Sequence, residues 1–413
     1  MTEELKARIA QINAGTAPAG YKKTKVGIVP VEWEAIPFGE LVDEYRTKTK
    51  TENEDVLLSC AINGIFLNSE LFSHQRGASN IGYLKIDYGT LILSAQNLHL
   101  GNANVNLRFE SGIVSPAYKT YKIRNCDVKY FSFWIKREET KRFFYNATTT
   151  GASQCRRNIE WDSLYEQKVV LPPLPEQQKI AEILTAQDRV IALIEKQIEA
   201  LKQQKKAFQQ KMFPKKGSKY PEIRFKGFTE PWATRKLGEI AECLDSMRVP
   251  LNAEERSKIQ GDIPYYGAGS IQGYINQYLF DEELVLLLED GDAFDDFKTK
   301  SIAQYVCGKS WVNNHSHVLR PKGNAYFLFT SLEHKDIRSA TQLAGASRKK
   351  LVQEAMLKIK TSVPSVDEQN RIGEFFSFLD NLITLHQRKL ELEQQKKKAL
   401  MQLLLTGKVR VKT

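Results

Sequence analysis

Two long stretches of the chain carry apolar residues at alternating steps of four and three, a spacing that places them on one face of an α-helix. Pro175 suits the first turn of the first helix, and Pro214 prevents that helix from continuing. In the second stretch Ser365 precedes Glu368 by three residues, as in a capping box, and Gly407 suits a left-handed helix end. We therefore predict two helices of about 37 residues, each roughly 55 Å long.

The apolar residues of these helices form a heptad seam, which needs a partner to bury it. Gln187 and Lys205 interrupt the seam of the first helix, and the lysines of both helices, including Lys205 and Lys397, are interpreted as a solvated flank. Because both seams lie in one chain, the pattern predicts an intramolecular coiled coil; the alternative is that each helix packs on its own domain. The predicted seam residues are Ile180, Leu184, Ile191, Ile194, Ile198, Leu201, Ile372, Phe376, Leu379, Ile383, Leu390 and Leu400.

The two helical segments are copies of each other. Residues 176–182 read EQQKIAE and residues 368–374 read EQNRIGE, so the copies lie 192 positions apart without a gap. The same offset superposes Asp380 on Asp188 and Lys397 on Lys205. A repeat this regular indicates a molecule of two halves, and 413 residues are too many for one compact core.

A second, weaker repeat opens each half. Residues 33–41 and residues 232–240 both begin with a tryptophan and run into a Gly-Glu pair, at an offset of 199 positions. The segments that follow, 42–150 and 241–340, show almost no residue match. The chain therefore repeats a frame, made of these opening segments and the two long helices, around two unlike inserts, residues 42–150 and 241–340.

The inserts contain short β-like runs bounded by Gly, Asn and Asp, such as Leu91–Leu93 and Leu284–Leu288. Two further segments, Ile135–Tyr145 and Leu328–Ser339, are predicted to be helices. A mixed α/β fold is predicted for each insert, and Met1–Asn13 is predicted to form an amphipathic N-terminal helix.

The charge of the chain favours a polyanionic partner such as nucleic acid, because 60 Lys and Arg residues against 49 Asp and Glu residues give a net charge of +11. The alternative is an ordinary basic protein. The five cysteines are scattered and form no C-x-x-C pair, which predicts neither a disulfide framework nor a zinc site and favours the cytoplasm. No apolar run reaches the roughly 18 residues of a membrane-spanning helix.

The motifs of common catalytic and cofactor sites are incomplete. Residues 303–310 resemble a phosphate-binding loop, but Ala303 stands where the turn needs glycine. Residues 267–273 are one position off the dinucleotide-binding spacing and are expected to form turns. The Pro-Pro pair at 172–173 lies between leucines and lacks the neighbours of a methyltransferase loop. The sequence therefore predicts no catalytic and no cofactor site.

Two histidines raise the question of a metal site. His315 and His317 lie close in sequence to Asp292, Asp295 and Asp296, a set of potential ligands. No H-E-x-x-H motif or cysteine pair supports such a site. Alternating histidines on a strand more commonly make ordinary polar contacts, so no metal is predicted.

The remaining polar residues of the inserts suit contact with DNA. Arg, Asn and Gln side chains pair with base edges, whereas lysines mainly contact phosphates. For any single residue, a solvated loop side chain is the simpler interpretation, and only the whole set supports the prediction. The predicted DNA-binding residues are His74, Gln75, Arg76, Asn97, His99, Arg108, Gln154, Arg156 and Arg157, with Asn80 and the residues from Asn102 to Arg108 alongside them, in the first insert, and Tyr266, Gln272, Lys298, Lys300, Lys309, Asn313, Asn314, His315, His317, Arg348 and Lys349 in the second.

Together these features resemble the specificity (S) subunits of type I restriction-modification systems, over nearly the whole chain. The resemblance rests on residues 20–33 and 221–232, which open the two halves, on the run PPLPEQQ at 172–178, and on residues 112–118 and 266–274 in the inserts.

The resemblance implies an α/β (α+β) fold with two target-recognition domains in a pseudo-twofold arrangement, joined by two long helices that form an antiparallel coiled coil. The implied domains are an N-terminal helix at 1–20, recognition domains at 21–170 and 215–363, and long helices at 171–214 and 364–413. Each recognition domain would read one half of a bipartite target in double-stranded DNA, and the coiled coil would set the spacing.

The same resemblance implies a chain that is not an enzyme. Its implied partners are two methyltransferase subunits that dock on the helices and restriction subunits that translocate and cut DNA, with no membrane. S-adenosylmethionine, ATP and Mg²⁺ would belong to those subunits. Two other classes stay open: a single-chain restriction enzyme or methyltransferase, which would need its own catalytic motif, and a coiled-coil scaffold, which would lack salt-sensitive binding to duplex DNA.

Overall fold

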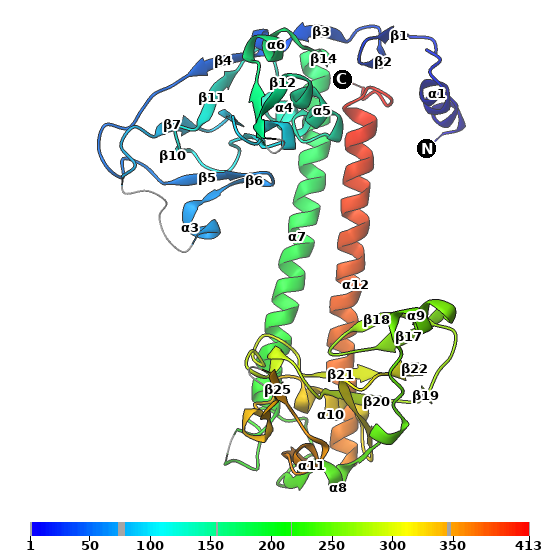
Figure 1. Cartoon of the computed structure of the whole chain (residues 1–413). Helices are drawn as coiled ribbons and strands as arrows, with labels where there is room; N and C mark the ends of the chain where they lie inside the picture. The colour runs from blue at the N-terminus through cyan, green and yellow to red at the C-terminus, as the bar shows by residue number, and fades with distance from the viewer. Residues whose placement is uncertain (1, 73–78, 154–155, 216, 345–347, 413) are drawn as a thin grey trace. The chain divides into compact units, whose positions relative to one another are not determined.

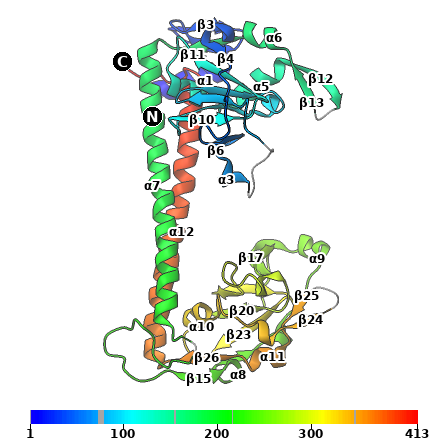
Figure 2. The same cartoon turned by 90° about the vertical axis from the view of Figure 1, so that its left-hand side faces the viewer.

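The computed structural model describes residues 2–72, 79–153, 156–215, 217–344 and 348–412. The chain divides into two compact units, one formed by Met1–Leu193 with Leu390–Thr413 and the other by Ile194–Lys389. Both units contain one end of each long helix, α7 (Leu174–Met212) and α12 (Val366–Leu404), which can be followed in Figures 1 and 2. Each of these helices has 39 residues, close to the predicted length.

The two long helices run antiparallel in each unit, as predicted. In the first unit Ile180, near the start of α7, shares a hydrophobic cluster with Leu404 at the end of α12. In the second unit Phe208, near the end of α7, meets Phe375 of α12 edge to face, with ring centroids 5.1 Å apart. The start of one helix therefore lies beside the end of the other.

Ion pairs between α7 and α12 recur at equivalent positions. Lys397 Nζ lies 2.5 Å from Asp188 Oδ1 in the first unit, and Lys205 Nζ lies 2.9 Å from Asp380 Oδ2 in the second. The offset of 192 positions converts one pair into the other. The duplication therefore preserved a contact between the helices and not only their residues.

Every predicted seam residue is buried or half-buried. The two polar residues that interrupt the seam find partners: Gln187 Nε2 donates to Glu393 Oε2 at 2.6 Å, and Lys205 pairs with Asp380. The expectation that Lys205 and Lys397 belong to a solvated flank is wrong, because both make ion pairs with the other helix.

Each unit contains a four-stranded antiparallel sheet with the same topology. In the first unit its order is β4 (Val42–Tyr45), β11 (Tyr118–Ile123), β8 (Leu91–Ser94) and β9 (Ala103–Val105). In the second it is β16 (Ala241–Cys243), β23 (Ser316–Pro321), β20 (Leu284–Leu288) and β21 (Ala303–Val306).

A further group of strands repeats as well. In the second unit β17 (Gln260–Tyr266) forms a hairpin with β18 (Ile271–Ile275) and lies parallel to β22 (Lys309–Val312), which pairs with β19 (Phe280–Asp281). In the first unit the hairpin of β5 (Leu58–Ala61) and β6 (Gly64–Leu67) joins the pair of β7 (Leu84–Asp87) and β10 (Ser111–Val114) through a parallel bridge between Leu57 and Ile113. Inserts that share almost no residues therefore share a topology.

The repeated sequence frame forms the base of each unit. The strand after each opening tryptophan pairs with the strand before the long helix: β3 (Glu34–Pro37) with β14 (Lys168–Leu171), and β15 (Ala233–Lys236) with β26 (Lys360–Val363). Trp33 and Trp232 are both 1 % exposed, so each anchors its unit.

The helices of the inserts differ from the predictions at their ends. The segment predicted at Ile135–Tyr145 forms α5 (Glu138–Asn146), which follows α4 (Val128–Trp134). The segment predicted at Leu328–Ser339 forms α10 (Ala325–Leu332), which begins and ends earlier than predicted; just beyond its end, the carbonyl of Glu333 accepts from the backbone N–H of Ile302.

The other elements are short. In the first unit they are α1 (Glu3–Asn13), close to its predicted range, β1 (Tyr21–Thr24), β2 (Gly27–Pro30), α2 (Phe38–Leu41), α3 (Asn68–Leu71), η1 (Leu98–Leu100), β12 (Thr148–Ser153), β13 (Arg156–Ile159) and α6 (Trp161–Glu166). In the second they are α8 (Leu237–Ile240), η2 (Asp245–Met247), α9 (Ala253–Lys258), η3 (Asp292–Phe294), η4 (Arg338–Ala340), β24 (Gln342–Ala344), β25 (Arg348–Lys350) and α11 (Gln353–Leu357). None of the helices in the described part of the chain combines the length and apolar composition that crossing a membrane requires.

Candidate nucleic-acid interface

In the second unit, the ends of several strands are tied together at one place. The backbone N–H of Asn313, after β22, donates to the carbonyl of Tyr266 at the end of β17 (3.0 Å). The hydroxyl of Ser316, at the start of β23, donates to the carbonyl of Gly267 (3.1 Å). We call this region the second strand-end cluster; it comprises Tyr266, Gly267, Gln272, Glu289, Asp290, Asn313–His317 and Lys349–Leu351.

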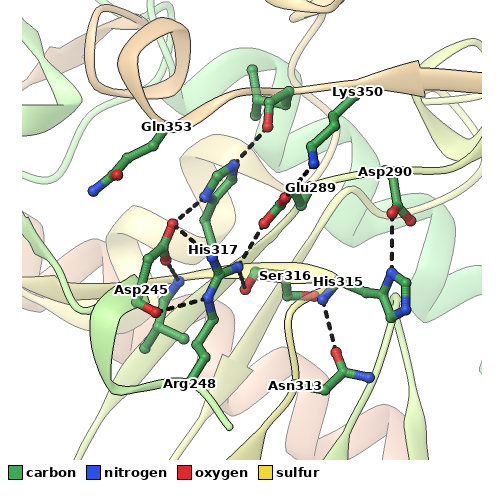
Figure 3. Close-up of polar contacts among 12 residues, drawn as sticks. Asp245, Arg248, Glu289, Asp290, Asn313, His315, Ser316, His317, Lys350 and Gln353 are labelled. Atoms are coloured by element: carbon green, nitrogen blue, oxygen red, sulfur yellow. Dashed lines mark hydrogen bonds and ion pairs between the residues drawn. The ribbon is translucent and has the colours of Figure 1, made fainter. Parts of the chain in front are cut away.

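The cluster presents polar side chains to solvent. Asn314 and Gln272 are exposed, and the side chain of Lys350 is 45 % exposed. The His315 side chain is 38 % exposed, with its Nδ1 3.0 Å from Asp290 Oδ2 (Figure 3). Amide, imidazole and ammonium groups at one strand end are the kinds of donor and acceptor that contact base edges and phosphates.

A buried charge network lies beneath these side chains. Arg248, just after η2, donates from Nη1 to Glu289 Oε2 (2.6 Å) and to the Ser316 carbonyl (2.9 Å). Its Nε donates to the Asp245 carbonyl (3.1 Å), and Lys350 Nζ lies 3.0 Å from Glu289 Oε1. Figure 3 shows the Arg248 guanidinium between Asp245 and Glu289. One guanidinium thus joins three backbone segments.

His317 completes the network and is itself buried. Its Nδ1 lies 2.5 Å from Asp245 Oδ2, and its Nε2 lies 2.8 Å from the carbonyl of Leu351. Burial raises the pKa of Asp245, but hydrogen bonds from His317 and from the Val318 N–H outweigh burial, so that this pKa lies below its ordinary value.

The geometry of this network does not suit a metal ion. Potential ligand atoms of Asp245, Glu289 and His317 lie within 4.8 Å of one another. However, the positively charged Arg248 donates a hydrogen bond to Glu289, one of these three residues. Both ring nitrogens of His317 also have hydrogen-bond partners already. Two of the aspartates considered from the sequence have other partners: Asp295 pairs with Lys349 and Asp296 with Lys300.

The first unit ties the equivalent strand ends with different residues. Tyr118, at the start of β11, donates its hydroxyl to the carbonyl of Cys60 near the end of β5 (3.3 Å). Lys136 Nζ donates to the carbonyl of Ile62 (2.8 Å) and to Asn104 Oδ1 (2.6 Å). Burial lowers the pKa of Lys136 to about 8. The two units therefore hold the same strand ends with unlike chemistry.

Several residues predicted to contact DNA are buried or make polar contacts within their own unit. Asn80, Asn102, Asn104 and Asn106 are buried, and all donate side-chain N–H groups within the first unit. Arg108 makes a bidentate pair with Glu70, at 2.7 and 3.0 Å. In the second unit, Asn313 and His317 are also buried. The side chains of these asparagines and of His317 are therefore enclosed within their units, and their contact with DNA stays a prediction.

The other predicted residues of the first unit are distributed as follows. Asn97 is exposed, while His99 and Arg157 are half-buried, and burial and the charge of Arg157 lower the pKa of His99. The Arg157 guanidinium lies 4.1 Å from the ring centroid of Tyr145. His74, Gln75, Arg76 and Gln154 lie outside the described residues, as does the side chain of Arg156.

In the second unit, Tyr266, Gln272, Asn314, His315 and Lys349 belong to the strand-end cluster. Lys309 lies at the opposite end of β22, 4.9 Å from the ring centroid of Tyr278. Lys298 and Lys300 are exposed between η3 and β21, and Lys300 pairs with Asp296 at 2.7 Å. The side chain of Arg348 lies outside the described residues.

The two loop motifs considered from the sequence are turns between strands. Residues 303–310 form β21 and the start of β22, joined by a turn in which Gly308 has a φ of 77°. Residues 267–270 form the turn between β17 and β18, as predicted, but residues 271–273, which were also predicted to form turns, belong to β18. Neither turn opens a helix, which a phosphate-binding loop requires.

The residues that support the strand ends of the two units could not be found from the sequence. Arg248 reaches Glu289 across 41 positions, and Lys136 reaches Ile62 across 74. No local spacing signals such contacts, because they depend on which strands lie together.

Comparison with known proteins agrees with this architecture. The type I restriction modification DNA specificity domain matches the chain twice, over residues 9–203 and 229–394. The chain belongs to the type I restriction-modification DNA specificity family. The two matches cover both copies of the repeated frame and both inserts, so the family extends over nearly all of the two units.

Similar specificity subunits align over nearly their full length. The type I restriction enzyme MjaVIII specificity subunit of Methanocaldococcus jannaschii is 25 % identical over 421 residues, which cover 93 % of this chain and 94 % of that protein. The S subunit of a type I restriction-modification system from M. genitalium has a similar fold, with a TM-score of 0.59 at 16 % identity over 92 % of this chain and 96 % of that one. A chain from a type I restriction-modification assembly has a TM-score of 0.53 at 11 % identity, covering 92 % and 99 %.

Proposed function

We propose that each unit reads one half of a bipartite DNA target and that the chain has no catalytic activity of its own. The observation that carries this proposal is the contrast between a repeated topology and unlike strand-end residues. A pair of readers for two different half-sites needs the same scaffold with different side chains at the same place. The net charge of +11 supports binding to the phosphate backbone.

The long helices would fix the distance between the half-sites. A helix advances about 1.5 Å per residue and resists bending, so its length sets a spacing in a way that a flexible linker does not. The recurrent pairs Asp188–Lys397 and Lys205–Asp380 hold the helices in one register in each unit. A fixed register favours a fixed number of unread base pairs.

The exposed apolar residues of the helices suggest where partners dock. On α12, Phe378, Leu385 and Leu392 recur at intervals of seven residues and are 62–64 % exposed. On α7, Leu193 occupies the position equivalent to Leu385 and is 57 % exposed. Exposed apolar residues at heptad spacing, away from the seam, are typical of a helix that packs against further helices.

We infer that Leu193 and Leu385 belong to two equivalent docking sites, one for each of two methyltransferase subunits. S-adenosylmethionine would bind to those subunits, and ATP and Mg²⁺ to restriction subunits that join the complex. Duplicated sites on one chain explain how a single specificity subunit accommodates two copies of one partner.

DNA reading is tested with the full chain in complex with its methyltransferase subunits. The complex is incubated with a synthetic library of random duplexes, and the retained duplexes are sequenced. We expect two short motifs of different sequence, separated by a fixed number of unread base pairs. A single uninterrupted motif, or no motif, would contradict the proposal.

Docking is tested by the number of methyltransferase subunits that copurify. Leu385→Asp is expected to release one subunit, Leu193→Asp one, and the double variant both, because a carboxylate in an apolar contact is strongly unfavourable. Gln387→Asp, at an exposed position two residues from Leu385, is the matched control and should retain both subunits. Full retention by the double variant would exclude this surface.

A further inference from the structure

The exposed side chains of the second strand-end cluster rest on an almost fully enclosed set of charges. The side chains of Arg248, Asp245 and Glu289 are 14, 7 and 13 % exposed. Asn314 and His315 stand between two anchored neighbours: the Asn313 N–H is bonded to β17, and the Ser316 carbonyl accepts from Arg248. The position of this loop therefore depends directly on the guanidinium.

Stability alone does not explain a charge network at this place. Replacing a buried ion network by apolar residues commonly leaves stability unchanged or increases it, because the ions must be desolvated. The apolar core of the unit already includes Val285, Leu287 and Leu319 on the same sheet. The network instead fixes the positions of backbone segments relative to one another, since each hydrogen bond of Arg248 goes to a different segment.

The partners of Arg248 come from separate parts of the chain. Asp245 belongs to η2, Glu289 follows β20, and Ser316 begins β23. Through Glu289, the network also reaches Lys350 on β25. A planar guanidinium with several fixed donors can serve all these acceptors together, whereas a lysine ammonium at the end of a flexible chain cannot.

The first unit holds the equivalent strand ends by other means. There the donors are Tyr118 and Lys136, as described above, and their acceptors are mainly backbone carbonyls. A change at Arg248 therefore leaves the first unit's support intact. Because each unit would read its own half-site, base preference can be measured for the two units separately. The first half-site then serves as the internal control for a variant of the second unit.

We propose that Arg248 is a positioning residue for the half-site read by the second unit, acting through Glu289 and the Ser316 carbonyl on the loop that carries Asn314 and His315. This inference rests on the proposed function and adds a specific residue to it. Reading a base edge requires donors and acceptors placed within about 0.5 Å, which a loop achieves only when its supports are fixed.

The test uses the full chain with its methyltransferase subunits and the same random duplex library. Arg248→Met removes the guanidinium and keeps an unbranched apolar stem, and Arg248→Lys keeps the charge. Arg320→Met is the matched control, because Arg320 forms bidentate bonds with Glu282 at the opposite end of β23. Thermal unfolding of each variant is measured in parallel.

We expect Arg248→Met to reduce the preference for the best second half-site over its single-base variants by about tenfold, the scale of one base contact, while the first half-site keeps its preference. Arg248→Lys should not restore the preference, and Arg320→Met should not disturb it. Unchanged reading of the second half-site in Arg248→Met would overturn the inference. Equal loss at both half-sites would overturn it as well.

A second variant keeps the test decisive if Arg248→Met does not fold. Lys350→Met changes a half-exposed residue that touches only the edge of the network, and it should weaken second half-site reading in the same direction but less. If Lys350→Met folds and reads both half-sites normally while Arg248→Met unfolds, the role of the network is structural and the inference fails. If the unaltered complex selects no bipartite motif, the proposed function fails instead.

Discussion

Near the start of each long helix, a buried glutamate forms an ion pair with an arginine from a distant segment. The two pairs are expected to differ in how much unfolding free energy is lost when the arginine is replaced. In the second unit, Arg224 donates from Nε and Nη2 to the two oxygens of Glu368, both at 2.7 Å. Glu368 is 1 % exposed and the Arg224 side chain 14 %. In the first unit, Arg410 holds Glu176 in the same bidentate way, at 2.7 and 2.9 Å.

The surroundings of the two glutamates are not equal. The indole Nε1 of Trp33 also donates to Glu176 Oε2 at 3.2 Å. The equivalent indole, of Trp232, makes no hydrogen bond among the residues described. Glu176 therefore keeps a donor when its arginine is removed, whereas the described residues offer the Glu368 carboxylate no second side-chain donor.

We predict that Arg224→Met costs about 2–3 kcal/mol of unfolding free energy, below the 3–5 typical of a deeply buried pair, because the Arg224 side chain keeps some exposure to solvent. A loss of this size lowers the melting temperature of such a unit by on the order of 5–10 °C. Arg410→Met should cost only about 1–2 kcal/mol, because Trp33 still satisfies Glu176 and Arg410 is more exposed.

The assay is calorimetric unfolding of the full chain, combined with hydrogen exchange at the first turns of α7 and α12 to assign each change to a unit. The control is Arg338→Met, since Arg338 pairs with Asp336 at the surface and its removal should leave the melting temperature unchanged. A shift for Arg224→Met no larger than that of the control would refute this reasoning. A larger shift for Arg410→Met than for Arg224→Met would refute the role given to Trp33.

Three further predictions follow from other parts of the structure. Phe376 is fully buried and Phe378 is 63 % exposed on the same helix, so Phe376→Ala should cost about 3–5 kcal/mol in urea unfolding and Phe378→Ala less than about 0.5. Hydrogen bonds keep the pKa of Asp245 below its ordinary value, so the ionised carboxylate stabilises the second unit fully above about pH 4 and loses that effect as the pH falls further. Asp245→Asn should remove this part of the acid sensitivity. Thermal unfolding between pH 2.5 and 6 measures the difference. Inserting seven residues at equivalent positions of α7 and α12 lengthens each helix by roughly 10 Å and should widen the unread gap by about three base pairs in sequenced methylation sites, whereas an unchanged gap would exclude the helices as the spacer.

The helical frame could be predicted from the sequence because its contacts follow from local periodicity. The seam is visible every three or four residues, and the duplication shows which residues form it twice. Even so, the sequence did not show that Lys205 and Lys397 pair with the other helix. A lysine beside an apolar stripe can face solvent or form an ion pair, and the sequence does not show which acidic residue of the neighbouring helix lies next to it.

The inserts were much harder to predict, for two physical reasons. Their strands are short and pair across long separations, so the topology common to β4–β11–β8–β9 and β16–β23–β20–β21 leaves no local signal. An asparagine amide also serves a base edge and a buried carbonyl equally well. Asn102 and Asn104 were therefore predicted to read DNA, although they brace the first unit from within.

The central proposal is that each insert reads its own half of the target on a common frame. The most direct test replaces residues 241–350 with the corresponding insert of a related specificity subunit and sequences the methylated sites of cells that also carry the partner subunits. We predict that one half of the methylated motif changes, while the other half and the gap stay the same. A motif with neither half altered, or with both halves altered, would contradict the claim.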